Sequence, residues 1–225
     1  MPCTMIIESH DKPALLEVFR YGLWSAMLAM IVNVGSTLAL LGFLLIPGTR
    51  LDLVSDALGF LVAALFLVLV VSIQHAATKD QRMNTHLGLI FAVLYLITVS
   101  SNYYLQLTVV RHLPIDGGAV IPAVFTSVFL AMETLGYGFL GVATLWVAPV
   151  FCGGRLESTI RWLFIVNGVL GVLGILVYPF DADPRIFFGG LFIWDVIFPL
   201  SMLLLAIFFA GQINEIKQMR ISPTT

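Results

Sequence analysis

Six long, mostly apolar runs alternate along the chain with short segments rich in charge, glycine and proline. The runs cover residues 21–46, 53–73, 87–110, 119–151, 162–180 and 186–210. A bilayer core of about 30 Å is crossed by about 20 apolar residues of helix, and every run reaches or nearly reaches that length. Helix is the expected state, because lipid cannot satisfy open backbone groups and barrel strands are much shorter. The pattern predicts an all-α bundle of about six transmembrane helices, forming one transmembrane domain over residues 1–225.

Composition and charge fix the expected compartment and orientation. Of the 225 residues, 60% are hydrophobic and 11% charged, which is too few charges to cover a soluble domain of this size. Lysine and arginine concentrate on the side of the amino terminus, the second and fourth loops and the carboxyl tail: Lys12, Arg20, Lys79, Arg82, Arg155, Arg161, Lys217 and Arg220. The other side has only Arg50, Arg111 and Arg185. Because basic residues stay cytoplasmic, we expect both termini inside, in a plasma or inner membrane.

Two acidic residues lie where hydrocarbon is expected. Glu133 falls near the middle of the fourth run, and Asp195 falls in the outer half of the sixth. An ionised acid at the bilayer centre costs about 2.5–3.5 kcal/mol on insertion scales. Each acid must therefore be neutral, paired or next to a wet cavity, and both are candidate catalytic groups. The alternative is a neutral acid that bonds a neighbouring helix and serves only packing.

Further polar side chains provide candidate ligand-binding groups. Tyr95, Thr98, Asn102 and Gln106 recur at helical spacing, so they share one face of the third run. Tyr103 and Tyr137 are expected to line a pocket with the acids. Asn33 and Asn167 lie near the middles of the first and fifth runs, where packing against glycine-rich faces is the competing interpretation. An outward-opening cavity would gather these residues with Glu133 and Asp195.

Other features narrow the expected chemistry. The four histidines lie in or beside loops, so no membrane pair can bracket a haem, and no Cys/His cluster suggests a metal site. No Walker or dinucleotide glycine motif occurs, and we expect no cofactor. A net charge of −2 without a basic stripe argues against nucleic-acid binding. The second run has no polar residue from Ala57 to Val71, so we expect it to face lipid. The Trp194 ring either faces lipid or forms one wall of a pocket, and we favour lipid.

Some sequence segments resemble a known group of proteins. The segment 102–111 (NYYLQLTVVR), Gly136-Tyr137-Gly138 and Arg161-Trp162-Leu163-Phe164 are similar to small prokaryotic six-span membrane proteins without an assigned function. The resemblance implies the same fold over most of the chain and implies no activity. The two intramembrane acids are also similar to those of small membrane terpene cyclases, as an analogy without a shared motif.

Three functions fit these observations. The first, which we favour, is binding or transport of a small solute through an outward-facing polar cavity; six spans are few for a transporter, so a homo-oligomer is expected. The second is a membrane-embedded enzyme that acts on a lipid or isoprenoid, with Glu133 as general acid. The third is a structural or assembly subunit whose polar groups only hold helices together.

Overall fold

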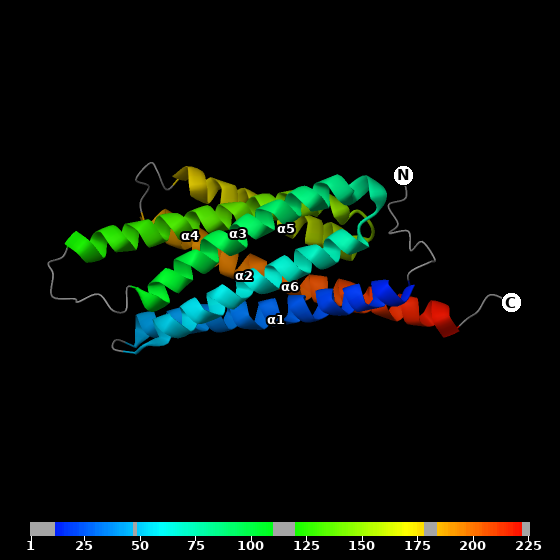
Figure 1. Ribbon diagram of the computed structural model, residues 1–225, viewed down its shortest axis with the longest axis horizontal. Coiled ribbons are helices and arrows are strands. Elements are labelled where there is room, and N and C mark those ends of the chain that lie inside the picture. Colours follow the sequence, from blue (N-terminus) through cyan, green and yellow to red (C-terminus); the bar gives the residue numbers. More distant parts are fainter. Residues whose placement is uncertain (1–11, 47–48, 110–119, 178–183, 222–225) are drawn as a thin grey trace.

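Six long helices make up the transmembrane part of the chain (Figure 1). The computed structural model describes residues 12–46, 49–109, 120–177 and 184–221. The helices are α1 (Lys12–Leu45), α2 (Leu51–Ala76), α3 (Arg82–Thr108), α4 (Val120–Val147), α5 (Arg155–Val177) and α6 (Pro184–Ile221), with short 3₁₀ helices η1 (Lys79–Gln81) and η3 (Ala148–Val150). No strand occurs within these ranges. All six helices are long and apolar enough to cross a bilayer, so the chain is an integral membrane protein with the predicted all-α, six-span fold.

The helices extend beyond the apolar runs at one end of the bundle. The first helix begins at Lys12 rather than at residue 21, and the last continues to Ile221 rather than ending near 210. Figure 1 shows the start of α1 and the end of α6 at the same end of the bundle. Charged side chains occupy these extensions; Arg20 donates to Glu17 at 2.6 Å. Hydropathy marks only the part of a helix inside hydrocarbon, which explains why the apolar runs are shorter than the helices.

The helices form a closed ring in the order of the sequence. Each helix packs against the next, and α6 returns to pack against α1. The expectation that the second run faces lipid holds for only one face of α2. Phe60 and Leu61 are exposed on the outside of the bundle, whereas Val62, Phe66 and Leu69 are buried. A helix without polar groups fits the dry interior of a protein as well as it fits lipid, so composition alone could not separate the two.

Aromatic side chains fill the interior of the helix ring toward the end of the bundle where α1 begins and α6 ends. Phe19 of α1 packs against Phe209 of α6, with ring centroids 6.0 Å apart. Phe151 lies edge-on to both Phe164 and Phe208, at 5.6 Å from each. Bulky rings packed in this way leave little free space. This half of the ring is a dry core, and it leaves the opposite half as the place for a cavity.

Helices α4 and α5 approach each other closely across glycines. A Cβ atom on Gly171 would lie 2.5 Å from the backbone oxygen of Tyr137, and one on Gly141 would lie 2.8 Å from the backbone oxygen of Gly168. Such contacts require residues without side chains, as is common between membrane helices. The close contact fixes the height and rotation of Tyr137 relative to α5.

Candidate functional site

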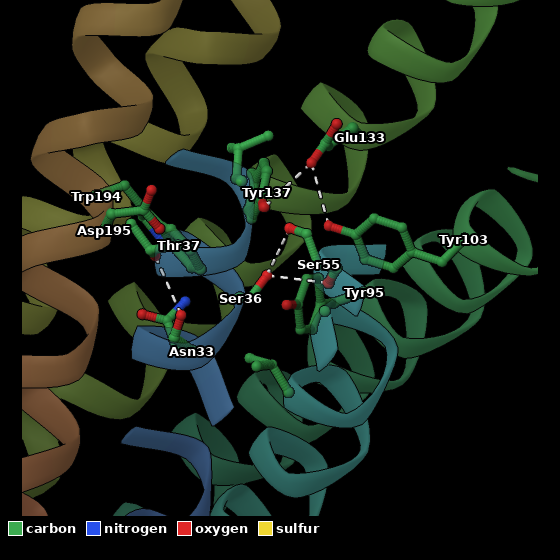
Figure 2. A pocket seen from close by; sticks show the side chains of 13 residues that line it. Asn33, Ser36, Thr37, Ser55, Tyr95, Tyr103, Glu133, Tyr137, Trp194 and Asp195 are labelled. Atoms are coloured by element: carbon green, nitrogen blue, oxygen red, sulfur yellow. Dashed lines mark hydrogen bonds between the residues drawn. The ribbon is translucent and has the colours of Figure 1, made fainter. Parts of the chain in front are cut away.

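A polar cavity of about 50 Å³ lies inside the ring, between α1, α2, α3, α4 and α6 (Figure 2). One water molecule requires about 10–15 Å³ on this measure, so the space holds a few water-sized groups. Most of the lining residues have a side-chain oxygen or nitrogen. The full lining consists of Asn33, Ser36, Thr37, Leu40, Ser55, Gly59, Val62, Tyr95, Tyr103, Glu133, Tyr137, Trp194 and Asp195.

Glu133 is held on one side of the cavity by two tyrosines. Its Oε1 atom accepts a hydrogen bond from the Tyr103 hydroxyl at 3.2 Å and another from the Tyr137 hydroxyl at 3.3 Å. Tyr103 comes from α3, whereas Tyr137 lies one turn after Glu133 on α4. The two donors hold the carboxyl group between α3 and α4, where it lines the cavity (Figure 2).

Asp195 is held on the α6 side by residues of α1. Its carboxyl group is hydrogen-bonded to the side chains of Asn33 and Thr37. The Thr37 hydroxyl also lies 3.1 Å from the backbone oxygen of Asn33, so its single proton can go to either acceptor. Asn33 is 4% exposed, and its Oδ1 atom has no hydrogen-bond partner among the described residues. The amide therefore donates to Asp195 and keeps an acceptor unused.

The α1–α2 side of the cavity is built from small residues. The Ser36 hydroxyl lies 3.0 Å from both the backbone oxygen and the hydroxyl of Ser55. One turn further along α2, a Cβ atom on Gly59 would lie 2.7 Å from the Tyr103 ring and 2.9 Å from its hydroxyl oxygen. The glycine thus makes room for the ring that reaches Glu133.

A continuous layer of aromatic rings closes the cavity on the side of the dry core. Tyr95 lies edge-on to Phe66, with centroids 5.8 Å apart, and Phe66 contacts Phe198 at 6.2 Å. Phe198 stacks on Trp194 at 4.8 Å, and Trp194 contacts Tyr137 at 4.6 Å. The layer runs from α3 through α2 and α6 to α4. At about 1.5 Å per residue, it lies roughly 20 Å from the ends of α2, α3 and α6 opposite to the termini.

The electrostatic character of the site is acidic. Its lining contains two carboxyl groups, those of Glu133 and Asp195, and no lysine, arginine or histidine. The two carboxyls are close enough to interact electrostatically, and Asp56 of α2 interacts with Glu133 in the same way. Asp52 and Asp56 lie one turn apart on the first part of α2, beside the lining residue Ser55. The acidic field therefore extends from the cavity toward the start of α2.

The structure brings together five of the eight residues that the sequence predicted for the site. Asn33, Tyr103, Glu133, Tyr137 and Asp195 all line the cavity.

The other three predicted residues lie outside it. Asn102 is fully buried, and neither polar atom of its amide has a partner among the described residues. Gln106 is half-buried on α3 and does not contribute to the lining. Asn167 of α5 donates to Thr144 of α4 at 3.3 Å, in agreement with a packing role. Of the periodic polar stripe on the third run (Tyr95, Thr98, Asn102 and Gln106), only Tyr95 therefore lines the cavity.

Several lining residues were not predicted from the sequence. Ser36, Thr37 and Ser55 are common in membrane helices, and only their pairing across α1, α2 and α6 makes them notable. The expectation that Trp194 faces lipid is wrong: its side chain is 7% exposed and forms a wall of the cavity. The useful signal was its position, next to Asp195 and five residues before Pro199 on the same helix.

Comparison with known proteins adds no family to this picture. No family model, curated protein or solved structure matches the chain. The function must therefore be inferred from the cavity itself.

Proposed function

We propose that this protein binds a small water-soluble solute in the ring cavity, entering from the side of the membrane opposite the chain termini. The observation that carries the proposal is the meeting of Glu133, Asp195 and three tyrosines around one space inside the ring. Helix packing alone does not require carboxyl groups on two sides of a cavity, and it costs free energy to place carboxyl groups within the membrane.

The position of the cavity supports entry from one side only. The aromatic layer of Tyr95, Phe66, Phe198, Trp194 and Tyr137 separates the cavity from the side of the termini. The positive-inside rule predicts that this side is cytoplasmic. An outward-facing site with a closed inner layer corresponds to one half of the cycle of an alternating-access transporter.

The α6 helix supplies a place where such a layer can open. Pro199 follows Phe198 directly and offers no N–H to the backbone oxygen of Asp195. Helices bend at such positions. A bend at Pro199 would move Trp194 and Phe198, two members of the layer, together with Asp195. We therefore favour transport of the bound solute over static binding.

The size of the cavity favours this function over a lipid-modifying enzyme. Pockets for drug-sized ligands enclose about 300–1,000 Å³, whereas this cavity measures about 50 Å³. An isoprenoid or acyl chain would have to displace several of the lining side chains. A solute of a few heavy atoms fits without such a change.

The proposal is tested by the small molecules that the purified protein carries. Compounds released on denaturation are identified by mass spectrometry for the wild type, Glu133→Gln and Glu215→Gln. Glu215 is an exposed acid near the end of α6, far from the cavity, and provides the matched control. We expect a small polar compound in the wild type and in Glu215→Gln that is lost in monodisperse Glu133→Gln. Equal amounts in all three proteins, or no compound in any of them, would overturn the proposal.

A further inference from the structure

Three properties of the cavity restrict the class of solute, provided that the proposed binding function holds. They are the two carboxyl groups that line it, the unused acceptor of Asn33, and the aromatic rings of Tyr137 and Trp194.

The carboxyl groups of the lining favour a cation, because a bound cation stabilises their ionised form. Two carboxyl groups line the space without a lysine, arginine or histidine among the lining residues. Asp52 and Asp56 continue the acidic field toward the start of α2, where Arg50, which directly precedes the helix, is an exposed basic residue. A cleft lined by charges of one sign concentrates ions of the opposite sign. An anion would face two carboxyl groups, and none of the described lining residues carries a basic group to compensate them.

The unused acceptor selects a cation that carries N–H donors. Asn33 donates its amide N–H to Asp195 and leaves Oδ1 without a partner among the described residues, at a position that is 4% exposed. A buried polar atom without a partner costs about 1–3 kcal/mol. A primary ammonium group brings three donors, which can be shared between Asp195, Glu133 and a neutral acceptor such as this amide or the Ser36 hydroxyl.

The aromatic rings favour an organic cation over a bare metal ion. Tyr137 and Trp194 line the cavity next to Glu133 and Asp195, respectively, and their ring centroids are 4.6 Å apart (Figure 2). The faces of tyrosine and tryptophan attract ammonium groups and also pack against their alkyl substituents. Within the described residues, no three His, Cys, Asp or Glu side chains lie close enough together to hold a metal ion.

From these properties we infer that the solute is a small primary ammonium ion of a few heavy atoms. Its nitrogen lies between Glu133 and Asp195, and its alkyl part lies against Tyr137 and Trp194. The ion enters past Asp52 and Asp56.

Trp194 provides a reporter for this inference. It is 7% exposed and lines the cavity, whereas Trp24, Trp146 and Trp162 are 59%, 38% and 63% exposed on the outer surface of the bundle. Replacing those three by phenylalanine leaves Trp194 as the only source of tryptophan emission. The emission of this purified single-tryptophan protein is titrated with methylammonium chloride, sodium chloride, sodium acetate, tetramethylammonium chloride and methanol.

We expect a saturable change with methylammonium and none with the other four additives. Glu133→Gln or Asp195→Asn, each introduced into the single-tryptophan protein, should weaken the methylammonium response at least about tenfold, the loss expected for a charge-assisted contact. The two substitutions lie on different helices, so a folding defect in one leaves the other to decide, and Glu215→Gln should respond like the parent protein.

Three results would overturn the inference. A response to sodium chloride equal to that with methylammonium would assign the site to alkali cations. A response to methanol or acetate would show a neutral or anionic solute, in which case solute binding survives and the ammonium class fails. A response unchanged in both Glu133→Gln and Asp195→Asn would place the ammonium ion outside the cavity.

Discussion

The contact between α4 and α5 predicts a large difference between two neighbouring glycine substitutions. In Gly171→Ala, the new Cβ atom would lie 2.5 Å from the backbone oxygen of Tyr137 and 3.0 Å from the Cα atom of Gly141. In Gly174→Ala, the nearest atom is the Thr134 methyl group, 3.8 Å away. The first change meets rigid backbone, whereas the second fills ordinary contact space one turn along the same helix.

The size of the effect follows from the clash. Ordinary contact of a Cβ atom begins at 3.4 Å, so in Gly171→Ala the two helices must move apart by nearly 1 Å. Forcing atoms into a packed interface typically costs about 1–3 kcal/mol. Both variants gain the higher helix propensity of alanine, roughly 1 kcal/mol. That gain cancels in the comparison, so Gly171→Ala should be less stable than Gly174→Ala by about 1–3 kcal/mol.

The assay is thermal unfolding of the two purified proteins in the same detergent, followed by near-ultraviolet circular dichroism. For a chain of this length, 1 kcal/mol corresponds to roughly 2–4 °C in the transition midpoint. We expect Gly174→Ala to unfold at or above the wild-type midpoint, and Gly171→Ala to unfold about 2–12 °C below Gly174→Ala. Because Tyr137 lies on the displaced helix, Gly171→Ala should also weaken the methylammonium response. Equal midpoints for the two variants would refute the close approach of α4 and α5.

Three further substitutions, one of them with a matched control, separate the cavity from the packing around it. Gly59→Ala places a Cβ atom 2.7 Å from the Tyr103 ring and should weaken methylammonium binding several-fold in the fluorescence titration, whereas Gly211→Ala, which meets nothing within 4 Å, should leave binding unchanged. Asn167→Ala removes the hydrogen bond to Thr144 and should lower stability by about 0.6 kcal/mol in a denaturant titration while binding stays at the wild-type level; a loss of binding would give Asn167 a role in the site. Asn102→Leu replaces a fully buried amide that has no hydrogen-bond partner among the described residues, so the midpoint of thermal unfolding should stay the same or rise. A clearly lower midpoint would show that the Asn102 amide does make a stabilising hydrogen bond.

The fold was predictable because hydrocarbon imposes a simple rule on the sequence. An apolar run of sufficient length must be helical in lipid, and the six runs correspond to the six helices of the structure. The rule measures only the apolar part, so it missed the charged first turns of α1 and the last turns of α6. The rule also does not tell which face of an apolar helix meets lipid, so it could not predict the buried face of α2.

The site was only partly predictable for a related reason. A carboxyl group in an apolar run is rare enough to attract notice alone, and both Glu133 and Asp195 line the cavity. Amides and hydroxyls are tolerated at helix interfaces, so Asn102 and Asn33 look equivalent in the sequence although only Asn33 reaches the cavity. The difference depends on how each helix is rotated in the ring, and such rotation is set by contacts between distant residues.

The most direct test of the account is the accessibility of Ser55 from the side opposite the chain termini. Cells that carry Ser55→Cys in the otherwise unchanged chain, in which Cys152 is not a free thiol, are treated with membrane-impermeant methanethiosulfonate reagents, one cationic and one anionic, and the parent protein is treated in parallel. Ser25→Cys, at a buried position of α1 on the dry side of the ring, provides the control.

An open, acidic cavity predicts that Ser55→Cys reacts from outside the cell. After normalisation to a free thiol in solution, the cationic reagent should react faster than the anionic one, and Ser25→Cys should not react. Failure of Ser55→Cys to react from outside, or reaction only when the cytoplasmic side is exposed, would contradict an outward-facing polar cavity.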